Sequence, residues 1–200
     1  AACKRLIYAD TFYEAVQRDN VEVVIEDVTQ IEETGIRSPD GELREFDIIV
    51  LATGFQADRF MRPMTITGRN GNTLENAWAQ RPTAYMAVSI PDFPNLFMLN
   101  GPNGPVGNFS LIEIAEQQWH YIQQLMDKVE QGECREICAS ETALAQFDEA
   151  RIAAAKRSIF GSGCQSWYLD AQGVPATWPW SRSHFKACMQ RPDFSAYEQH

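Results

Sequence analysis

The run from Phe46 to Ala52 constrains the fold of this chain more than any other feature. Its sequence, Phe-Asp-Ile-Ile-Val-Leu-Ala, would make both faces of an extended strand apolar. Such a strand is typical of a sheet that helices cover on both sides, as in parallel α/β proteins. It runs into Thr53-Gly54-Phe55, where small residues let the backbone pass close to a ligand at the end of a strand. The sequence therefore predicts an α/β fold with a buried strand, although Ala-Thr-Gly alone also fits a plain exit into a loop.

Four other segments have the residues of β-strands. Val21–Ile25 is a short β-rich run, and Leu96–Leu99 is a second apolar run that leads into a loop. Residues 31–36 and 42–46 flank Ser-Pro-Asp-Gly at positions 38–41, where proline presets φ and glycine permits a left-handed step. We therefore predict a β-hairpin over residues 31–46.

Two helices are predicted from apolar spacing and capping residues. From Ser110 to Val129 apolar side chains recur at helical spacing, Ser110 and Glu113 form the capping-box pattern, and Gly132 is a stop signal. A second helix is predicted over residues 141–158 with Ser140 as its N-cap. The last forty residues are aromatic and need a core surface or a ligand pocket to lie against.

Composition excludes several classes of protein. The net charge of −10 argues against a nucleic-acid or anionic-membrane partner, and no apolar run approaches the roughly 18 residues of a spanning helix. The five cysteines fit reduced, structural thiols in a cytoplasmic protein. Cys134 and Cys138 could be a metal pair, but no second Cys/His pair has zinc-ligand spacing, so no metal site is expected. The chain begins at Ala1 rather than Met and carries no signal peptide, which suggests a piece of a longer protein.

A longer match adds to the interpretation of residues 47–55. Asp47 to Phe55 closely resembles the Ala-Thr-Gly signature of flavin-containing and Baeyer–Villiger monooxygenases. Further segments follow the family's order of landmarks. They are residues 3–5, 13–21, 66–71, Trp78, 81–85, 92–97, 101–105, the acidic helix with Trp119, and Ser166-Trp167-Tyr168. The tail at 178–181 and 194–198 is similar to the branch near 4-hydroxyacetophenone monooxygenase.

The resemblance implies a fold and a division into domains. The fold would be the C-terminal portion of an α/β flavoprotein with two dinucleotide-binding domains. Residues 1–51 would be the C-terminal part of the NADPH domain, 52–160 the C-terminal part of the FAD domain, and 161–200 an aromatic extension.

The resemblance also assigns roles to two basic residues, although a solvated basic pair near a terminus is the alternative. Lys4 looks like the lysine that meets the 2′-phosphate of NADPH, for which a point charge with three donors is suited. Arg5 looks like the catalytic arginine that faces the flavin. A permanent cation there would stabilise both the anionic oxygenated flavin and the oxyanion that develops on the substrate.

Other candidate residues would contact the cofactors. Thr53 and Gly54 belong to the Ala-Thr-Gly strand end, and Trp167 would donate its indole N–H to the NADP ribose or else be a core tryptophan. The loop 100–105 leads towards a helix whose N-terminus would aim at the pyrimidine end of the flavin. Asn103 and Asn108 are candidates for contacts to the isoalloxazine, with turn and cap roles as the alternative. His120 and His184 lack a sequence partner and are predicted to be structural or exposed.

Both phosphate-binding motifs of the family are missing. The chain contains no Gly-x-Gly-x-x-Gly turn and no Phe-x-Gly-x-x-x-His-x-x-x-Trp fingerprint. We therefore expect the chain alone to bind FAD weakly or not at all, to be inactive, and to need the missing N-terminal half of the protein. Strands that lack sheet neighbours would also make homo-oligomers more common than a clean monomer.

The implied activity is an FAD- and NADPH-dependent monooxygenation of a small-molecule ketone or aldehyde, giving an ester or lactone. Oxygenation of nitrogen or sulfur atoms in a heteroatom substrate is a second possibility, since it shares the Ala-Thr-Gly strand. A non-catalytic interaction or dimerisation remnant is a third, from a different class of function.

Overall fold

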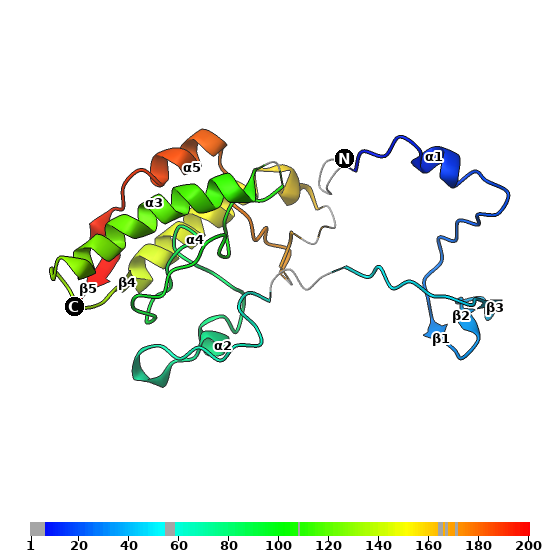
Figure 1. The fold of residues 1–200 in the computed structure, drawn as a ribbon, viewed down its shortest axis with the longest axis horizontal. Helices are drawn as coiled ribbons and strands as arrows, with labels where there is room; N and C mark the ends of the chain where they lie inside the picture. The colour runs from blue at the N-terminus through cyan, green and yellow to red at the C-terminus, as the bar shows by residue number, and fades with distance from the viewer. Residues whose placement is uncertain (1–6, 55–58, 108, 164–165, 167, 171) are drawn as a thin grey trace. The chain divides into compact units, whose positions relative to one another are not determined.

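The computed structural model describes residues 7–54, 59–107, 109–163, 166, 168–170 and 172–200. Its contacts divide these residues into two compact units, residues 7–54 and residues 59–200. Figure 1 shows the elements of both units.

The smaller unit holds a short helix and a three-stranded antiparallel sheet. Helix α1 spans Phe12–Ala15, and strands β1 (Gln30–Ile31), β2 (Gly35–Arg37) and β3 (Leu43–Glu45) pair in the order β1-β2-β3. Ile36 faces Arg44 across the β2–β3 hairpin. The turn is closed by the Gly41 amide, which donates to the Ser38 carbonyl at 3.0 Å, and Gly41 adopts a φ of 88°. The predicted turn and the hairpin around it are confirmed. The strand expected over residues 31–36 is interrupted, because residues 32–34 form a second turn and Ile31 belongs to β1.

The strand predictions for residues 21–25 and 46–52 are wrong. Neither segment has regular structure, and the side chains of Ile48, Val50 and Leu51 are 80%, 82% and 69% exposed. A strand forms only where a neighbouring strand takes up its N–H and C=O groups, and no described strand pairs with either segment. The run is apolar on both faces, but the described residues do not cover it.

The larger unit is built around two capped helices. Helix α3 spans Leu111–Glu130, with the Ser110 hydroxyl accepting from the Glu113 amide, and helix α4 spans Glu141–Ala155, with the Ser140 hydroxyl accepting from the Ala143 amide. Gly132 has a φ of 75°, as a left-handed helix stop requires. Both predicted helices are confirmed, although α4 ends three residues earlier than expected.

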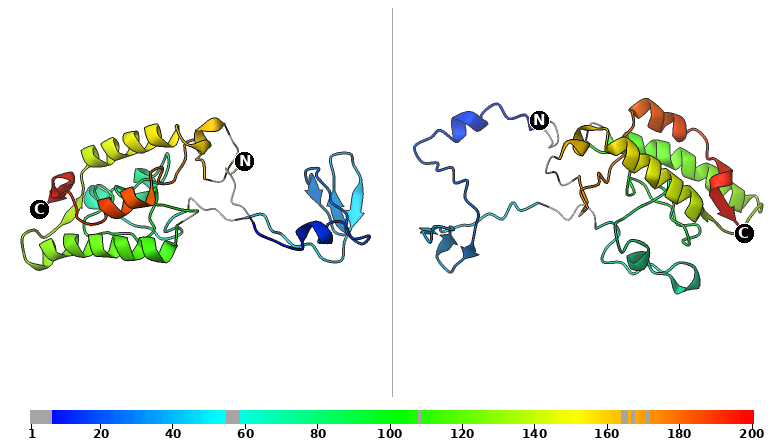
Figure 2. Two further views of the ribbon diagram at one scale, coloured as in Figure 1. Left: turned by 90° about the horizontal axis from the view of Figure 1, so that it is seen from above. Right: turned by 180° about the vertical axis from the view of Figure 1, so that it is seen from behind.

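Shorter elements connect and complete this unit. Strands β4 (Ile137–Ala139) and β5 (Tyr197–Gln199) pair antiparallel, so the C-terminal residues lie beside the segment between the two long helices (Figure 2). The helical turns are η1 (Arg69–Gly71), α2 (Leu74–Ala77), η2 (Ile159–Ser162), α5 (Arg182–Cys188) and η3 (Phe194–Ala196). The strand expected at 96–99 is reduced to an isolated bridge between Ser89 and Phe97, beside which the Met98 amide donates to the Val88 carbonyl.

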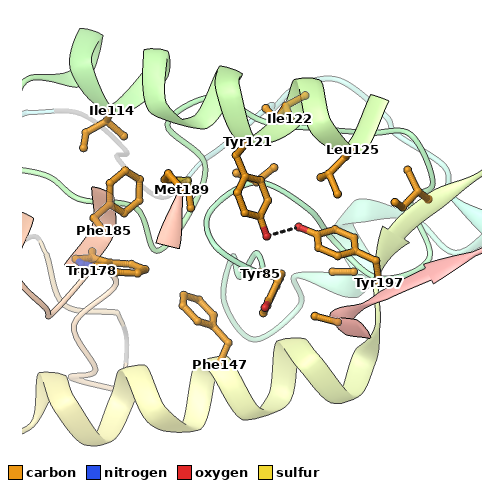
Figure 3. Packing of buried hydrophobic residues seen from close by; sticks show 14 of the residues in the cluster. Tyr85, Ile114, Tyr121, Ile122, Leu125, Phe147, Trp178, Phe185, Met189 and Tyr197 are labelled. Atoms are coloured by element: carbon orange, nitrogen blue, oxygen red, sulfur yellow. Dashed lines mark hydrogen bonds between the residues drawn. The ribbon is translucent and has the colours of Figure 1, made fainter. Parts of the chain in front are cut away.

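The main hydrophobic core lies between α3 and α4 (Figure 3). Residues of the aromatic tail fill much of it: Trp178, Phe185 and Tyr197 are buried, and the Trp178 and Trp180 rings are 4.7 Å apart. The Tyr197 hydroxyl donates to the Tyr121 hydroxyl at 3.0 Å within this core. The prediction that the tail lies against a core surface is confirmed for these residues.

A second, smaller cluster lies under the loops of residues 59–98. Its buried members are Leu74, Trp78, Ala84, Ile90, Phe93 and Met98. The Trp78 indole donates to the Thr83 carbonyl at 2.8 Å. Among the helices in the described ranges, none is long and apolar enough to cross a membrane.

Candidate functional site

Four of the predicted site residues, Lys4, Arg5, Asn108 and Trp167, lie outside the described residues. Their roles in NADPH and flavin binding therefore stay predictions. The described candidates are Thr53, Gly54 and Asn103, and they belong to different compact units.

Thr53 and Gly54 lie on an exposed segment of the smaller unit. Gly54 has a φ of 88°, a conformation that other residues rarely adopt, and a Cβ added there would meet no atom within 4 Å. The glycine is therefore explained by its backbone conformation. The turn glycines Gly41 and Gly71 have the same open space, so the cofactor contact of Thr53 and Gly54 stays a prediction.

Asn103 is only 2% exposed and joins three segments that are far apart in the sequence. Its side-chain oxygen accepts from the Ala84 amide at 3.1 Å, and its side-chain nitrogen donates to the Ala176 carbonyl at 3.4 Å. Its φ is 69°, within the left-handed region that asparagine tolerates. The loop-forming alternative accounts for these contacts, and a contact of Asn103 to the isoalloxazine stays a prediction.

A tight hairpin begins at Tyr168, the last residue of the Ser-Trp-Tyr element, and is described over residues 168–170 and 172–176. The Ala176 amide donates to the Tyr168 carbonyl at 2.8 Å, and Gly173 takes a φ of 74° at the turn. One carboxylate oxygen of Asp170 accepts from the Gln172 and Val174 amides at 2.9 and 2.8 Å. Asp170 thus organises this turn in the way that aspartate commonly does.

A network of four charged side chains adjoins this hairpin. In helix α4, Arg151 is fully buried and donates to one Asp148 oxygen at 2.9 and 2.6 Å. Arg81 donates to the other Asp148 oxygen at 2.6 Å and pairs with Asp170 at 3.7 Å. Arg151 also donates to the Pro175 carbonyl. The formal charges cancel, which is what allows a guanidinium to be buried.

Sequence analysis missed this charge network, although one signal pointed to part of it. Phe147, Arg151 and Ala155 are the buried residues of α4 and lie four residues apart on one face. A charged residue on such a face requires a partner, and Asp148 is within one turn. The contribution of Arg81 and Asp170 could not be foreseen, because only the fold brings them to α4.

The start of α3 differs in one detail from a full capping box. The Glu113 side chain pairs with Arg182 of α5 at 3.1 Å instead of returning to the Ser110 amide. The hydrogen bond from Arg182 lowers the pKa of the Glu113 carboxyl below its usual value. Glu113 therefore links the start of α3 to α5 as an anion.

His184 has a thiol neighbour that sequence analysis did not foresee. The Cys188 sulfur lies 3.7 Å from the His184 ring nitrogen, one helical turn away in α5. Burial raises the pKa of the Cys188 thiol, which disfavours the nucleophilic thiolate. The pair therefore does not form an activated nucleophile, and His184 is exposed, as predicted.

Two cavities open on the larger unit. One of about 520 Å³ has Trp78, Arg81 and Thr83 on one side and Glu141, Leu144 and Asp148 of α4 on the other. Another, of about 250 Å³, is lined by residues that include Phe60, Arg62 and Trp78. The first adjoins the charge network, so Arg81 and Asp148 form part of its wall. Within the described residues, no cluster of His, Cys, Asp and Glu could hold a metal ion.

Comparison with known sequences identifies relatives over nearly the whole chain. An uncharacterised monooxygenase of Mycobacterium tuberculosis is 41% identical over 187 residues, which cover 94% of this chain and 38% of that protein. An FAD-binding monooxygenase of Aspergillus terreus is 32% identical over 194 residues, covering 94% of this chain and 34% of that protein. No family model matches the chain.

Solved structures agree with these sequence matches. The closed form of cyclohexanone monooxygenase superposes with a TM-score of 0.83 at 28% identity, covering 96% of this chain and 38% of that chain. Oxidised steroid monooxygenase bound to NADP gives 0.84 at 28% identity, covering 99% and 39%. The chain is homologous to a part of the flavin-dependent monooxygenases.

The match confirms the predicted family resemblance and fold class. The segment spans less than two fifths of the length of the first curated relatives. The division into parts at residues 51 and 160 stays a prediction, while the contacts themselves separate residues 7–54 from 59–200.

Proposed function

We propose that this chain serves as part of a longer FAD- and NADPH-dependent monooxygenase that oxidises a ketone or an aldehyde. One oxygen atom of O2 enters the substrate to give an ester or lactone, the other leaves as water, and NADPH is oxidised to NADP+. The main support for this proposal is that nearly the whole chain superposes on cyclohexanone monooxygenase and on steroid monooxygenase. The steroid monooxygenase structure is bound to NADP.

The chain's own residues would bind and orient the cofactors. When bound, NADPH supplies the hydride and FAD supplies the activation of oxygen. We propose that Lys4 binds the 2′-phosphate, that Arg5 stabilises negative charge beside the flavin, and that Trp167 orients the nicotinamide. Thr53 and Gly54 would let the backbone approach the cofactor, which the open space at Gly54 permits. Asn103 and Asn108 would lie at the isoalloxazine.

Apolar side chains of the smaller unit support a role within a larger protein. Ile48, Val50 and Leu51 are exposed in a segment with the pattern of a buried strand. Burying a side chain of this size typically contributes about 1.5–3 kcal/mol, so a covering partner would stabilise the unit. We propose that the remainder of the longer protein supplies this cover, with the cytoplasm as its compartment. The free thiols of Cys134, Cys138 and Cys188 are compatible with that compartment.

A hybrid enzyme tests the proposal. The segment of cyclohexanone monooxygenase that matches this chain would be replaced by the chain, and flavin absorbance, NADPH oxidation and conversion of a ketone would be measured. We expect bound flavin, ketone-dependent NADPH consumption and an ester or lactone product. A hybrid that binds FAD but oxygenates only amines or sulfides would instead indicate heteroatom oxygenation.

Matched variants distinguish the specific roles of Lys4 and Arg5 from a general effect of losing a positive charge. In the hybrid, Lys4→Ala should raise the KM for NADPH much more than that for NADH, and Arg5→Ala should abolish oxygenation. Arg18→Ala removes an exposed arginine of the same segment and should change neither. Equal losses in Arg5→Ala and Arg18→Ala would rule out the proposed role of Arg5.

A further inference from the structure

The hairpin of residues 168–170 and 172–176 is held to the rest of the larger unit at three points. Arg81 pairs with Asp170, Arg151 donates to the Pro175 carbonyl, and Asn103 donates to the Ala176 carbonyl. These partners come from a loop before α3, from α4, and from the loop of residues 100–105. Segments that are far apart in sequence therefore converge on one short hairpin.

The Arg151 anchor is buried and rigid. The guanidinium is fully buried, and its donors are directed to Asp148 and to the Pro175 carbonyl. Removing any of these partners would leave a buried charge with an unmet hydrogen bond, which proteins avoid. The position of Pro175 is thereby fixed relative to α4.

The Arg81 anchor is weaker and acts on the turn itself. One Asp170 oxygen is engaged by the Gln172 and Val174 amides, and the other faces Arg81 at 3.7 Å. No described residue donates a hydrogen bond to that second oxygen. Arg81 therefore holds the turn by charge, whereas its hydrogen bond at 2.6 Å goes to Asp148.

The third anchor connects the hairpin to the loop that leads into α3. Besides the bond from Asn103 to Ala176, the Trp178 amide donates to the Gly104 carbonyl at 3.1 Å. Tyr168, at the start of the hairpin, has its hydroxyl 3.9 Å from the position a Cβ on Gly107 would take. The hairpin thus lies along residues 103–107.

We propose that Arg81, Asp148, Arg151 and Asp170 are positioning residues for the NADPH-dependent reaction. They fix the hairpin to α4, while Asn103 and the bond between Trp178 and Gly104 hold it along residues 103–107. Together these contacts fix the Tyr168 end, and Tyr168 is the last residue of the Ser-Trp-Tyr element. This inference rests on the proposed function for its catalytic consequence, but the anchoring of the hairpin can be measured without it.

Hydrogen exchange of the complete 200-residue chain tests the anchoring. Arg81→Met should speed exchange of the Gly173, Val174 and Ala176 amides about tenfold, since opening the hairpin would no longer separate an ion pair. Arg81→Lys keeps the charge and should restore most of the protection. Arg182→Met is the matched control, because it removes an exposed arginine paired with Glu113 and should leave these amides unchanged.

Two results would overturn the anchoring. Unchanged hairpin exchange in Arg81→Met is one, and equal acceleration in the interior of α3 is the other, since it would mean general destabilisation. Asp170→Asn provides a second route if Arg81→Met fails to fold. It removes the charge that faces Arg81 while leaving an amide oxygen to accept from the Gln172 and Val174 amides.

The hybrid enzyme tests the catalytic consequence. Arg81→Met in the hybrid should raise the KM for NADPH about fivefold, with little change in kcat and with unchanged flavin absorbance, as expected for lost positioning of a binding segment. An unchanged KM alongside faster hairpin exchange would refute the positioning role. A parent hybrid that oxidises no NADPH would contradict the proposed function, while the exchange measurement would still decide the anchoring.

Discussion

At the scale of single residues, Asn103 shows why a loop residue selected from sequence can have more than one role. The Gly-Pro-Asn-Gly-Pro pattern marked a binding loop, and the structure explains the asparagine by its left-handed backbone and two buried hydrogen bonds. The pattern located the residue, but the Ala84 and Ala176 partners could not be predicted. They lie far from it in sequence and are brought together only by the fold.

Asn103→Ala should destabilise the larger unit more than Asn95→Ala does. Both asparagines have positive φ, 69° and 58°, and both use their amide for two hydrogen bonds, but Asn95 is exposed. Because the Ala84 amide would be left buried without an acceptor, we expect an excess cost of about 1–2 kcal/mol. Urea unfolding of the two variants measures the difference, and equal costs would show that backbone strain alone sets the effect.

At the scale of elements, predictability followed how local the determining contacts are. Helices α3 and α4 and the β2–β3 hairpin were predicted because caps, apolar spacing and a Pro-Asp-Gly turn act within a few residues. The segment 46–52 was predicted wrongly because a strand depends on neighbours, and its apolar pattern says nothing of whether they are present. The charge network was missed for a related reason, since Arg81, Asp148 and Asp170 are separated in sequence.

Ser140→Ala should cost more stability than Ser110→Ala, although both remove a helix N-cap. The Ser140 hydroxyl accepts from Ala143 at 3.1 Å in a half-buried position, whereas Ser110 accepts from Glu113 at 3.4 Å and is exposed. We expect a loss of about 1 kcal/mol for Ser140→Ala and less for Ser110→Ala. Thermal unfolding compares them, and the reverse order would indicate that solvent exposure does not weaken the cap.

At the scale of the whole molecule, the core between α3 and α4 should give the chain an alkaline limit. Burial raises the pKa of Tyr85, Tyr121 and Tyr197 above the usual value for tyrosine. The core accepts these phenols in their neutral form. Their contribution to the free energy of unfolding is therefore fully present below about pH 10, the pKa of tyrosine in an unfolded chain. It is lost as the pH rises from there through the raised pKa values of the folded state.

This alkaline limit can be observed in tyrosinate absorbance. These three tyrosines, of the six in the chain, should ionise only as the chain unfolds, so their absorbance change should coincide with loss of helical circular dichroism. Tyr197→Phe removes one of these phenols, so less stability should be lost between neutral and alkaline pH in this variant than in the parent chain. Full ionisation of all tyrosines while the helical signal persists would contradict the buried arrangement of these rings.

The exposed apolar segment of the smaller unit should make the isolated chain self-associate. Val50 is 82% exposed, and its neighbours Ile48 and Leu51 are 80% and 69% exposed. Val50→Asp should lower the average mass measured by analytical ultracentrifugation, because burying a charged side chain in a contact between two chains is costly. Asn20→Asp adds the same charge at an exposed polar position of this unit and serves as the control. An equal fall in both variants would point to net charge instead of the apolar segment.

The position of the aromatic tail in the core also bears on how the protein is made. The space between α3 and α4 is filled by Trp178, Phe185 and Tyr197, and β4 pairs with β5. During synthesis the two long helices are made before these residues. Until the tail emerges, the inner faces of both helices stay uncovered in the nascent chain. Translation speed and chaperone access over this stretch should therefore affect the yield of folded protein.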